Sequence, residues 1–161
     1  MTEIRRVIIH TDGSVFPNPG EGGWAAILQY KGKTRCISGY LPVATNNVSE
    51  AEAVIKALEL LKLPCVVDLY TDSMYVIRGI RALQCGRLLK TNQDRWKRLA
   101  PLMRTHQVHA IHVQGHNGNS LNELADSLAS KAREKKAGED FCLDDAPKTK
   151  KEAKQMLAAV A

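Results

Sequence analysis

Two apolar segments of the chain end in the same way, and this repeat limits the folds that the sequence can adopt. Residues 7–14 read VIIHTDGS and residues 66–73 read VVDLYTDS, so each apolar run leads into a Thr-Asp pair, at Asp12 and Asp72. Runs of this length that are rich in β-branched residues are typical of buried strands. In layered α/β sheets, ligands bind beyond the carboxyl ends of such strands. The repeat therefore predicts an α/β sheet with two carboxylates at one edge.

The rest of the chain supplies the other elements of such a sheet. Strands are expected at about 4–12, 24–30, 34–40, 65–71 and 108–115, and helices from a TNN cap (45–47) to about 61, within 73–104 with a break near 90–92, and over 119–137. Helices that alternate with strands imply a layered α/β architecture. A helix separates the first and fourth strands, so a right-handed crossover can place them parallel and adjacent. Asp12 and Asp72 would then lie close together.

The chain length of 161 residues favours one domain with its own core. We expect this domain to span residues 1–137, and residues 138–161 to form a C-terminal extension. In that extension, a polar loop would precede a short amphipathic helix after Pro147. The sequence shows no signal peptide and no apolar run of membrane length, so a cytoplasmic location and no membrane partner are expected. A monomer is expected, although the helix of the extension could dock on the domain or on another chain.

A glutamate on the first helix is the third candidate carboxylate. The apolar residues of 47–61 define a buried stripe that includes Val54, and Glu50 lies one turn before Val54 on the same face. Glu52 lies about 200° around the helix from Glu50 and is expected to face solvent. Because a carboxylate on an apolar stripe needs a partner, Glu50 is the candidate for a functional site.

An aspartate on the last helix is the fourth. Asp126 is expected beside the apolar stripe of residues 119–137, and Glu123 on the far side of that helix. Each acid alone has an ordinary interpretation: a turn residue for Asp12, a helix cap for Asp72 and a surface residue for Asp126. Together, the four acids would repel one another unless a cation lay between them. An all-oxygen set suits Mg²⁺ or Mn²⁺ better than Zn²⁺.

A histidine and a basic segment add to this pattern. His116 lies in VQGHNGNS, a Gly- and Asn-rich loop, where a histidine near a metal can shuttle protons. Residues 78–104 hold eight Arg and Lys residues and one Asp, a balance of +7, while the whole chain carries +6. This segment is either a solvated helical face or a surface that binds phosphates.

These motifs, taken together, resemble those of the type 1 ribonuclease H family. The matching stretches are TDGS with NPGEGGWAAIL, TNNVSEAEA, YTDSMYV, VQGHNGN and NELADSLA, in the order of the family and over roughly residues 5–135. The resemblance implies a ribonuclease H-like five-stranded mixed sheet flanked by helices. It also implies an endonuclease that uses two metal ions per site to hydrolyse the RNA strand of RNA–DNA hybrids, which leaves 5′-phosphate and 3′-hydroxyl ends.

The same resemblance assigns roles to residues. It makes Asp12, Glu50, Asp72 and Asp126 the metal-binding and catalytic carboxylates and His116 the catalytic loop histidine. For the substrate, it implies that the minor groove is read by backbone groups at Gly13 and Ser14 and by the side chains of Asn18, Asn46 and Glu50. Thr45 and Asn92 match positions that hold a phosphate of the DNA strand.

The sequence also departs from the family pattern. Met74 replaces a common glutamine, Leu83 stands where a DNA-facing tryptophan is common, and the segment after it is short. Weaker hybrid affinity, or reliance on the arginines of 78–104, would follow. Two other functions fit the same fold: a non-catalytic module that binds hybrids, and a nuclease or strand-transfer protein that acts on DNA. The four acids argue against the first, and the histidine loop and the TNN motif argue against the second.

Overall fold

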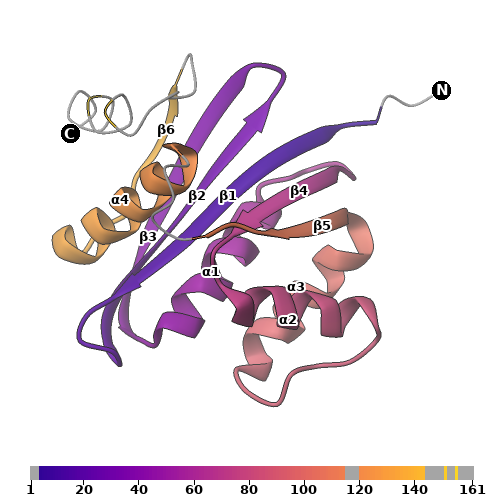
Figure 1. Ribbon diagram of the computed structural model, residues 1–161, viewed down its shortest axis with the longest axis horizontal. Coiled ribbons are helices and arrows are strands. Elements are labelled where there is room, and N and C mark those ends of the chain that lie inside the picture. The colour runs from indigo at the N-terminus through magenta and orange to yellow at the C-terminus, as the bar shows by residue number, and fades with distance from the viewer. Residues whose placement is uncertain (1–3, 115–119, 144–150, 152–154, 156–161) are drawn as a thin grey trace.

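The computed structural model describes residues 4–114, 120–143, 151 and 155 of the chain. These residues form a six-stranded mixed sheet with helices packed on it (Figure 1). The elements in chain order are β1 (Arg6–Val15), β2 (Gly20–Tyr30), β3 (Lys33–Ala44), α1 (Asn46–Glu59), β4 (Val66–Thr71), α2 (Met74–Gln84), α3 (Gln93–Thr105), β5 (Gln107–His112), α4 (Ser120–Lys135) and β6 (Asp140–Leu143). None of the described helices is long and apolar enough to cross a bilayer.

The strands lie in the order β5-β4-β1-β2-β3-β6. Strands β1, β2 and β3 form an antiparallel meander, and β4 pairs with both β1 and β5 in parallel. The predicted adjacency of the first and fourth strands is therefore confirmed, with His10 opposite Tyr70 at the end of their pairing. Lys31 and Gly32 join β2 to β3 with φ values of 47° and 78°, which suits a two-residue hairpin turn.

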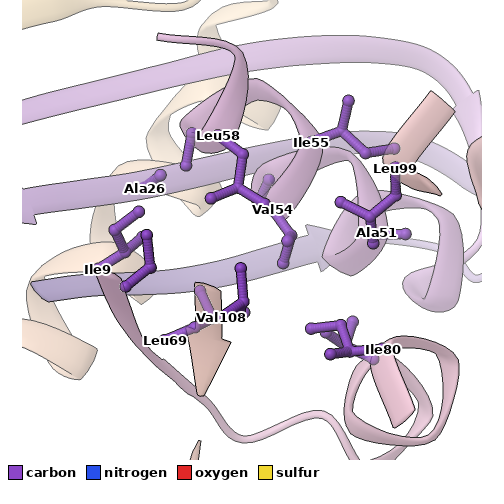
Figure 2. Close-up of a cluster of buried hydrophobic side chains, with 14 of the residues drawn as sticks. Ile9, Ala26, Ala51, Val54, Ile55, Leu58, Leu69, Ile80, Leu99 and Val108 are labelled. Carbon is purple, nitrogen blue, oxygen red and sulfur yellow. The ribbon is translucent and has the colours of Figure 1, made fainter. Parts of the chain in front are cut away.

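Helices cover both faces of the sheet, and Figure 1 shows α4 apart from α1, α2 and α3. Alternate residues of β2 point to opposite faces, as the pleat requires. Ala26 and Leu28 enter a large core cluster with α1, α2 and α3, whereas Ala25 and Ile27 pack with α4 in a smaller cluster. Figure 2 shows how side chains of α1 meet those of the strands and of α3 in the large cluster.

Side-chain caps begin α1 and α2 directly after the preceding strands. The hydroxyl of Thr45 accepts a hydrogen bond from the backbone N–H of Val48 at 3.2 Å, and Ser73 accepts one from Val76 at 3.1 Å. Such caps satisfy backbone donors that have no partner within the helix. The helix predicted after the TNN motif is confirmed, and the two or three helical segments expected within 73–104 are two helices, α2 and α3.

The structure adds a sixth strand to the predicted five. Residues after Gly138 that were expected to form a polar loop include β6, which pairs antiparallel with β3. Phe141 and Leu143 pack against the α4-side cluster, and Asp140 binds the Arg35 guanidinium at 2.7 Å. The prediction of a loop was wrong because two apolar residues in a four-residue strand give too weak an alternation to detect. Where the domain ends stays a prediction.

Strand β1 differs from what the sequence predicted, and part of the C-terminal extension lies beyond the residues with which the prediction could be compared. Strand β1 does not end at Asp12 as expected but continues to Val15, because it stays paired with β2 after its pairing with β4 has stopped. In the C-terminal extension, Lys151 and Gln155 are helical and exposed. The apolar residues of the helix expected after Pro147 lie outside the described residues.

Candidate active site

A polar cleft of about 370 Å³ opens beside the paired strands β1 and β4. Its walls come from β1, from the first turns of α1 and α4, and from the segment that joins β4 to α2. The lining residues are Asp12, Gly13, Asn46, Asn47, Glu50, Asp72, Ser73, Asn122, Glu123 and Asp126. All four carboxylates singled out from the sequence are among them.

Three of these carboxylates are close enough to share one ion. Asp12, Glu50 and Asp72 each offer an oxygen, and these oxygens all lie within 4.8 Å of one another. Asp12 comes two residues after His10 and Asp72 two residues after Tyr70, the last pair of the parallel β1–β4 register. Parallel pairing therefore explains why two acids sixty residues apart in sequence meet.

A glycine lets the strand and the first helix approach each other at this point. A Cβ atom on Gly13 would clash with the Ser49 hydroxyl and would lie only 2.9 Å from the backbone nitrogen of Glu50. The absence of a side chain thus allows β1 to pass directly against the start of α1. The N–H of Gly13 also donates to Asp12 Oδ1 at 2.9 Å, which orients that carboxylate. Gly13 therefore helps to bring Asp12 and Glu50 together.

Burial and mutual repulsion raise the pKa values of two of these carboxylates, Asp12 and Glu50. Burial raises the pKa of Asp12 to about 8, with further contributions from the negative charges of Asp72 and Asp126. Burial also raises the pKa of Glu50 well above its usual value, and the charge of Asp12 adds to that effect. Both shifts follow from placing like charges together away from water.

The residues present fit a hard divalent cation. All the candidate ligands are carboxylate oxygens, which Mg²⁺ and Mn²⁺ prefer. Glu50 Oε2 is buried and accepts no hydrogen bond from the described part of the chain. A buried oxygen of this kind is costly without a partner, and a cation held between Glu50, Asp12 and Asp72 would supply one.

Of the predicted substrate-binding residues, Gly13 and Asn46 line the cleft. Asn18 is held beside Asn46, because its Oδ1 accepts the Asn46 backbone N–H at 3.2 Å. Ser14 contacts α4, with its hydroxyl 3.3 Å from that of Ser130. These contacts tie the end of β1 to the second half of α4, and the loop after β1 to the start of α1.

The remaining predicted residues lie at helix starts or outside the described residues. Thr45 caps α1, as given above, and Asn92 precedes α3 with a left-handed φ of 54°. The side-chain amide of Asn92 donates to the Tyr75 hydroxyl at 2.8 Å. His116 lies outside the described residues, so its position relative to the cleft stays a prediction.

Four residues of the cleft were missed from the sequence: Asn47, Ser73, Asn122 and Glu123. Asn122 and Glu123 are both buried and line the cleft beside Asp126. The expectation that Glu123 lies on the far side of its helix was wrong. The start of α4 faces the carboxylate cleft as well as the sheet, and a stripe of apolar residues identifies only the side that faces the sheet.

The expectation that Glu52 faces solvent was also wrong. Its side chain is only 4% exposed and binds Arg95 at 3.1 Å and Arg98 at 3.0 Å. The helix α3 covers this face of α1, and the sequence periodicity of α1 alone could not reveal a second polar partner. Two of the eight cations in 78–104 are therefore used inside the fold.

The other six cations of this segment are exposed. They are Arg78, Arg81, Arg87, Lys90, Lys97 and Arg104. Leu83 does not point freely outward but is partly buried against the large core cluster, whereas Met74 is 42% exposed. The segment thus keeps a strongly positive surface next to the elements that carry Asp72 and Asn92.

Comparison with known proteins places the chain among nucleases. The RNase H family model matches residues 4–134. "Ribonuclease HI" of Caulobacter vibrioides is 48% identical over 135 residues, which cover 78% of this chain and 91% of that protein. "Ribonuclease H" of Thermoanaerobacter sp. (strain X514) is 44% identical over 135 residues, covering 77% and 87%.

A solved structure agrees with these relatives. LC11-RNase H1, solved in complex with an RNA/DNA hybrid, superposes with a TM-score of 0.68 at 27% identity, covering 81% of this chain and 98% of that one. The family match spans both walls of the carboxylate cleft, from β1 to α4. On the strength of that match and of relatives more than 40% identical, the chain belongs to the ribonuclease H family of metal-dependent endoribonucleases.

Proposed function

We propose that this protein hydrolyses the RNA strand of RNA–DNA hybrids and leaves 5′-phosphate and 3′-hydroxyl ends. The convergence of Asp12, Glu50 and Asp72, with ligand oxygens within 4.8 Å of one another, is the observation that carries the proposal. The names of the relatives and the hybrid in the complex of LC11-RNase H1 support the choice of substrate. A protein that only binds hybrids has no need of such a costly cluster of converging acids.

In this proposal, Asp12, Glu50, Asp72 and Asp126 hold two Mg²⁺ ions, which Mn²⁺ can replace. The bound metal supplies Lewis acidity, which lowers the pKa of water and offsets negative charge on phosphate oxygens. The Gly13 N–H keeps Asp12 oriented toward the cleft. His116, which precedes α4 in the sequence, would accept a proton and later return it. This role suits a histidine near neutral pH.

Recognition of RNA falls to groups around the 2′-hydroxyl, the feature that separates RNA from DNA. We propose that backbone groups of Gly13 and Ser14, with the side chains of Asn18, Asn46 and Glu50, read the minor groove. The Asn18–Asn46 hydrogen bond holds two of these groups together at the edge of the cleft. Thr45 and Asn92 would bind a phosphate of the DNA strand.

The test compares cleavage of three end-labelled duplexes of one sequence: RNA–DNA, RNA–RNA and DNA–DNA. Cleavage of the RNA strand of the hybrid alone is expected, with Mg²⁺ and not with EDTA. Products that carry a 5′-phosphate accept direct ligation, which tests the end chemistry. Hybrid binding without cleavage would indicate a binding module, and cleavage of the DNA duplex would indicate a DNA nuclease. The Asp12→Asn variant controls for a contaminating nuclease.

Location and assembly remain proposals based on the sequence. We propose a cytoplasmic monomer, with self-association through the C-terminal extension as the alternative. Sedimentation of the whole chain at several concentrations distinguishes the two, because only self-association makes the apparent mass rise with concentration.

A further inference from the structure

Glu52 is a buried charge that the chemistry proposed above does not use. It follows Glu50 by two residues on α1, and its side chain is 4% exposed. One guanidinium nitrogen of Arg98 lies 3.0 Å from both Glu52 oxygens, and Arg95 Nε lies 3.1 Å from one of them. Arg98 also binds Glu59 on the surface of α1 at 3.2 Å. The start and middle of α3 are thus fixed to the same helix that carries Glu50.

Residues of α2 and α3 also hold the segment that leads into α3. The indole N–H of Trp96 donates to the Thr91 carbonyl at 3.0 Å, and the Tyr75 hydroxyl lies 2.8 Å from the Thr91 hydroxyl. Trp96 is fully buried and packs so closely on Gly79 of α2 that a Cβ atom there would clash with the ring. Residues 91 and 92 are therefore held by contacts with both α2 and α3, so their position depends on where α3 packs.

We propose that Glu52 is a positioning residue for substrate: by binding Arg95 and Arg98, it sets segment 87–92 at a fixed position relative to Glu50. That segment carries the exposed cations Arg87 and Lys90, together with Asn92. The inference rests on the proposed function, because the phosphates that these groups would meet belong to the DNA strand of a hybrid. Glu52 itself touches neither substrate nor metal in this scheme.

A carboxylate suits this role better than an apolar residue of similar size. Apolar packing is non-directional, whereas hydrogen bonds between a guanidinium and a carboxylate fix the relative geometry of the two helices. The arginine side chains are 24% and 41% exposed, so both keep access to water. The Glu52→Gln variant removes the charge without leaving a buried cation unpaired, and it should therefore fold.

The first test separates substrate positioning from chemistry. Glu52→Gln should raise KM for the hybrid roughly two- to thirtyfold, the range found for residues that couple indirectly to a site, and should leave kcat nearly unchanged. The matched control is Glu59→Gln, which removes the exposed partner of the same Arg98 and should raise KM much less. A fall in kcat with KM unchanged, or equal effects of the two substitutions, would overturn the proposal.

The second test needs no substrate. The chain has two tryptophans, so its NMR spectrum holds two indole N–H signals, from Trp24 and Trp96. In Glu52→Gln, the Trp96 signal should shift and exchange faster with water, while the Trp24 signal should stay unchanged. Ile37→Val, a core substitution outside α1, α2 and α3, lowers stability by about 0.5–1.5 kcal/mol and should change neither KM nor the Trp96 signal.

The outcomes distinguish the two proposals. A wild-type protein that fails to cleave hybrids contradicts the proposed function, whereas the Trp96 signal still reports whether Glu52 anchors the segment. If Glu52→Gln leaves the Trp96 signal unchanged, or if Ile37→Val raises KM as much as Glu52→Gln does, then Glu52 contributes stability only and the inference is wrong.

Discussion

At the scale of single residues, the carboxylate of Asp12 serves the proposed metal site but lowers the stability of the metal-free protein. Its pKa is raised by burial and by Asp72, from an ordinary 3.8 to about 8. Between these two pH values, the metal-free folded protein binds more protons than the unfolded chain, so the free energy of unfolding falls as pH rises. A cation between the carboxylates would relieve the repulsion that causes this trend.

The first prediction follows from that sign. In EDTA, Asp12→Asn should have a higher Tm than wild type at pH 8, and the difference should shrink toward pH 4, where Asp12 is protonated in the folded protein and about half protonated in the unfolded chain. Burial lowers the pKa of His10 to about 4 and gives an opposite trend, but both proteins share it. Activity of the variant should be nearly abolished. Calorimetry across pH measures the first effect, and parallel Tm curves for the two proteins would contradict it.

Gly13 gives a second prediction at this scale. Gly13→Ala places a methyl group against Ser49 and 2.9 Å from the Glu50 nitrogen, so β1 and α1 must separate. Overpacking of this kind costs about 1–3 kcal/mol, and the separation of Asp12 from Glu50 should also weaken metal binding. Titration of Mg²⁺ by calorimetry checks this. Gly32→Ala is the control, because a methyl group there meets no atom within 4 Å although its backbone is strained. An unchanged metal affinity in Gly13→Ala would count against the role of the close approach.

At the scale of elements, the sequence predicted where helices and strands lie along the chain better than it predicted which side of each helix packs against other elements. Thr45 and Ser73 are recognisable caps, and the parallel crossover fixes which strands are neighbours. These features depend on local chemistry and on the handedness of connections. Whether Glu52 or Glu123 is buried depends instead on where α3 and the first turn of α4 pack, which no period within one helix records.

The third prediction concerns α2 and the segment after it. Arg81, Arg87 and Lys90 are exposed and form no ion pair within the described residues. If they contact phosphates, replacing all three by alanine in the inactive Asp12→Asn protein should weaken hybrid binding and lower the slope of log affinity against log salt by up to about three units. Arg95→Ala is not a suitable control, because Arg95 is paired with Glu52. Lys131 is paired with Glu139 at 2.7 Å, so Lys131→Ala should leave the slope unchanged. An unchanged slope in the triple variant would place the binding surface elsewhere.

At the scale of the whole molecule, β6 joins the C-terminal side of the chain to the sheet. Its pairing with β3 covers what would otherwise be an exposed edge of the meander, and unpaired edges promote association between chains. The sheet therefore depends on residues that follow the family match, which ends at residue 134.

The fourth prediction tests this dependence by shortening the chain. A chain that ends at Ala137 should have a lower Tm than a chain that ends at Leu143, by about 2–4 °C for each kcal/mol lost, and should scatter more light as concentration rises. The comparison with the longer variant controls for loss of the rest of the extension. Equal Tm values and equal scattering for the two chains would show that β6 adds nothing to the stability of the sheet.

The position of β6 in the sequence also affects how the protein emerges from the ribosome. Strand β3 is complete at Ala44, but its partner is complete only at Leu143, 99 residues later (143 − 44). At translation rates of roughly 5–20 residues per second, the edge of β3 stays unpaired for about 5–20 s in every nascent chain. Molecular chaperones that bind extended backbone can act during that interval, which ends when β6 has been made and pairs with β3.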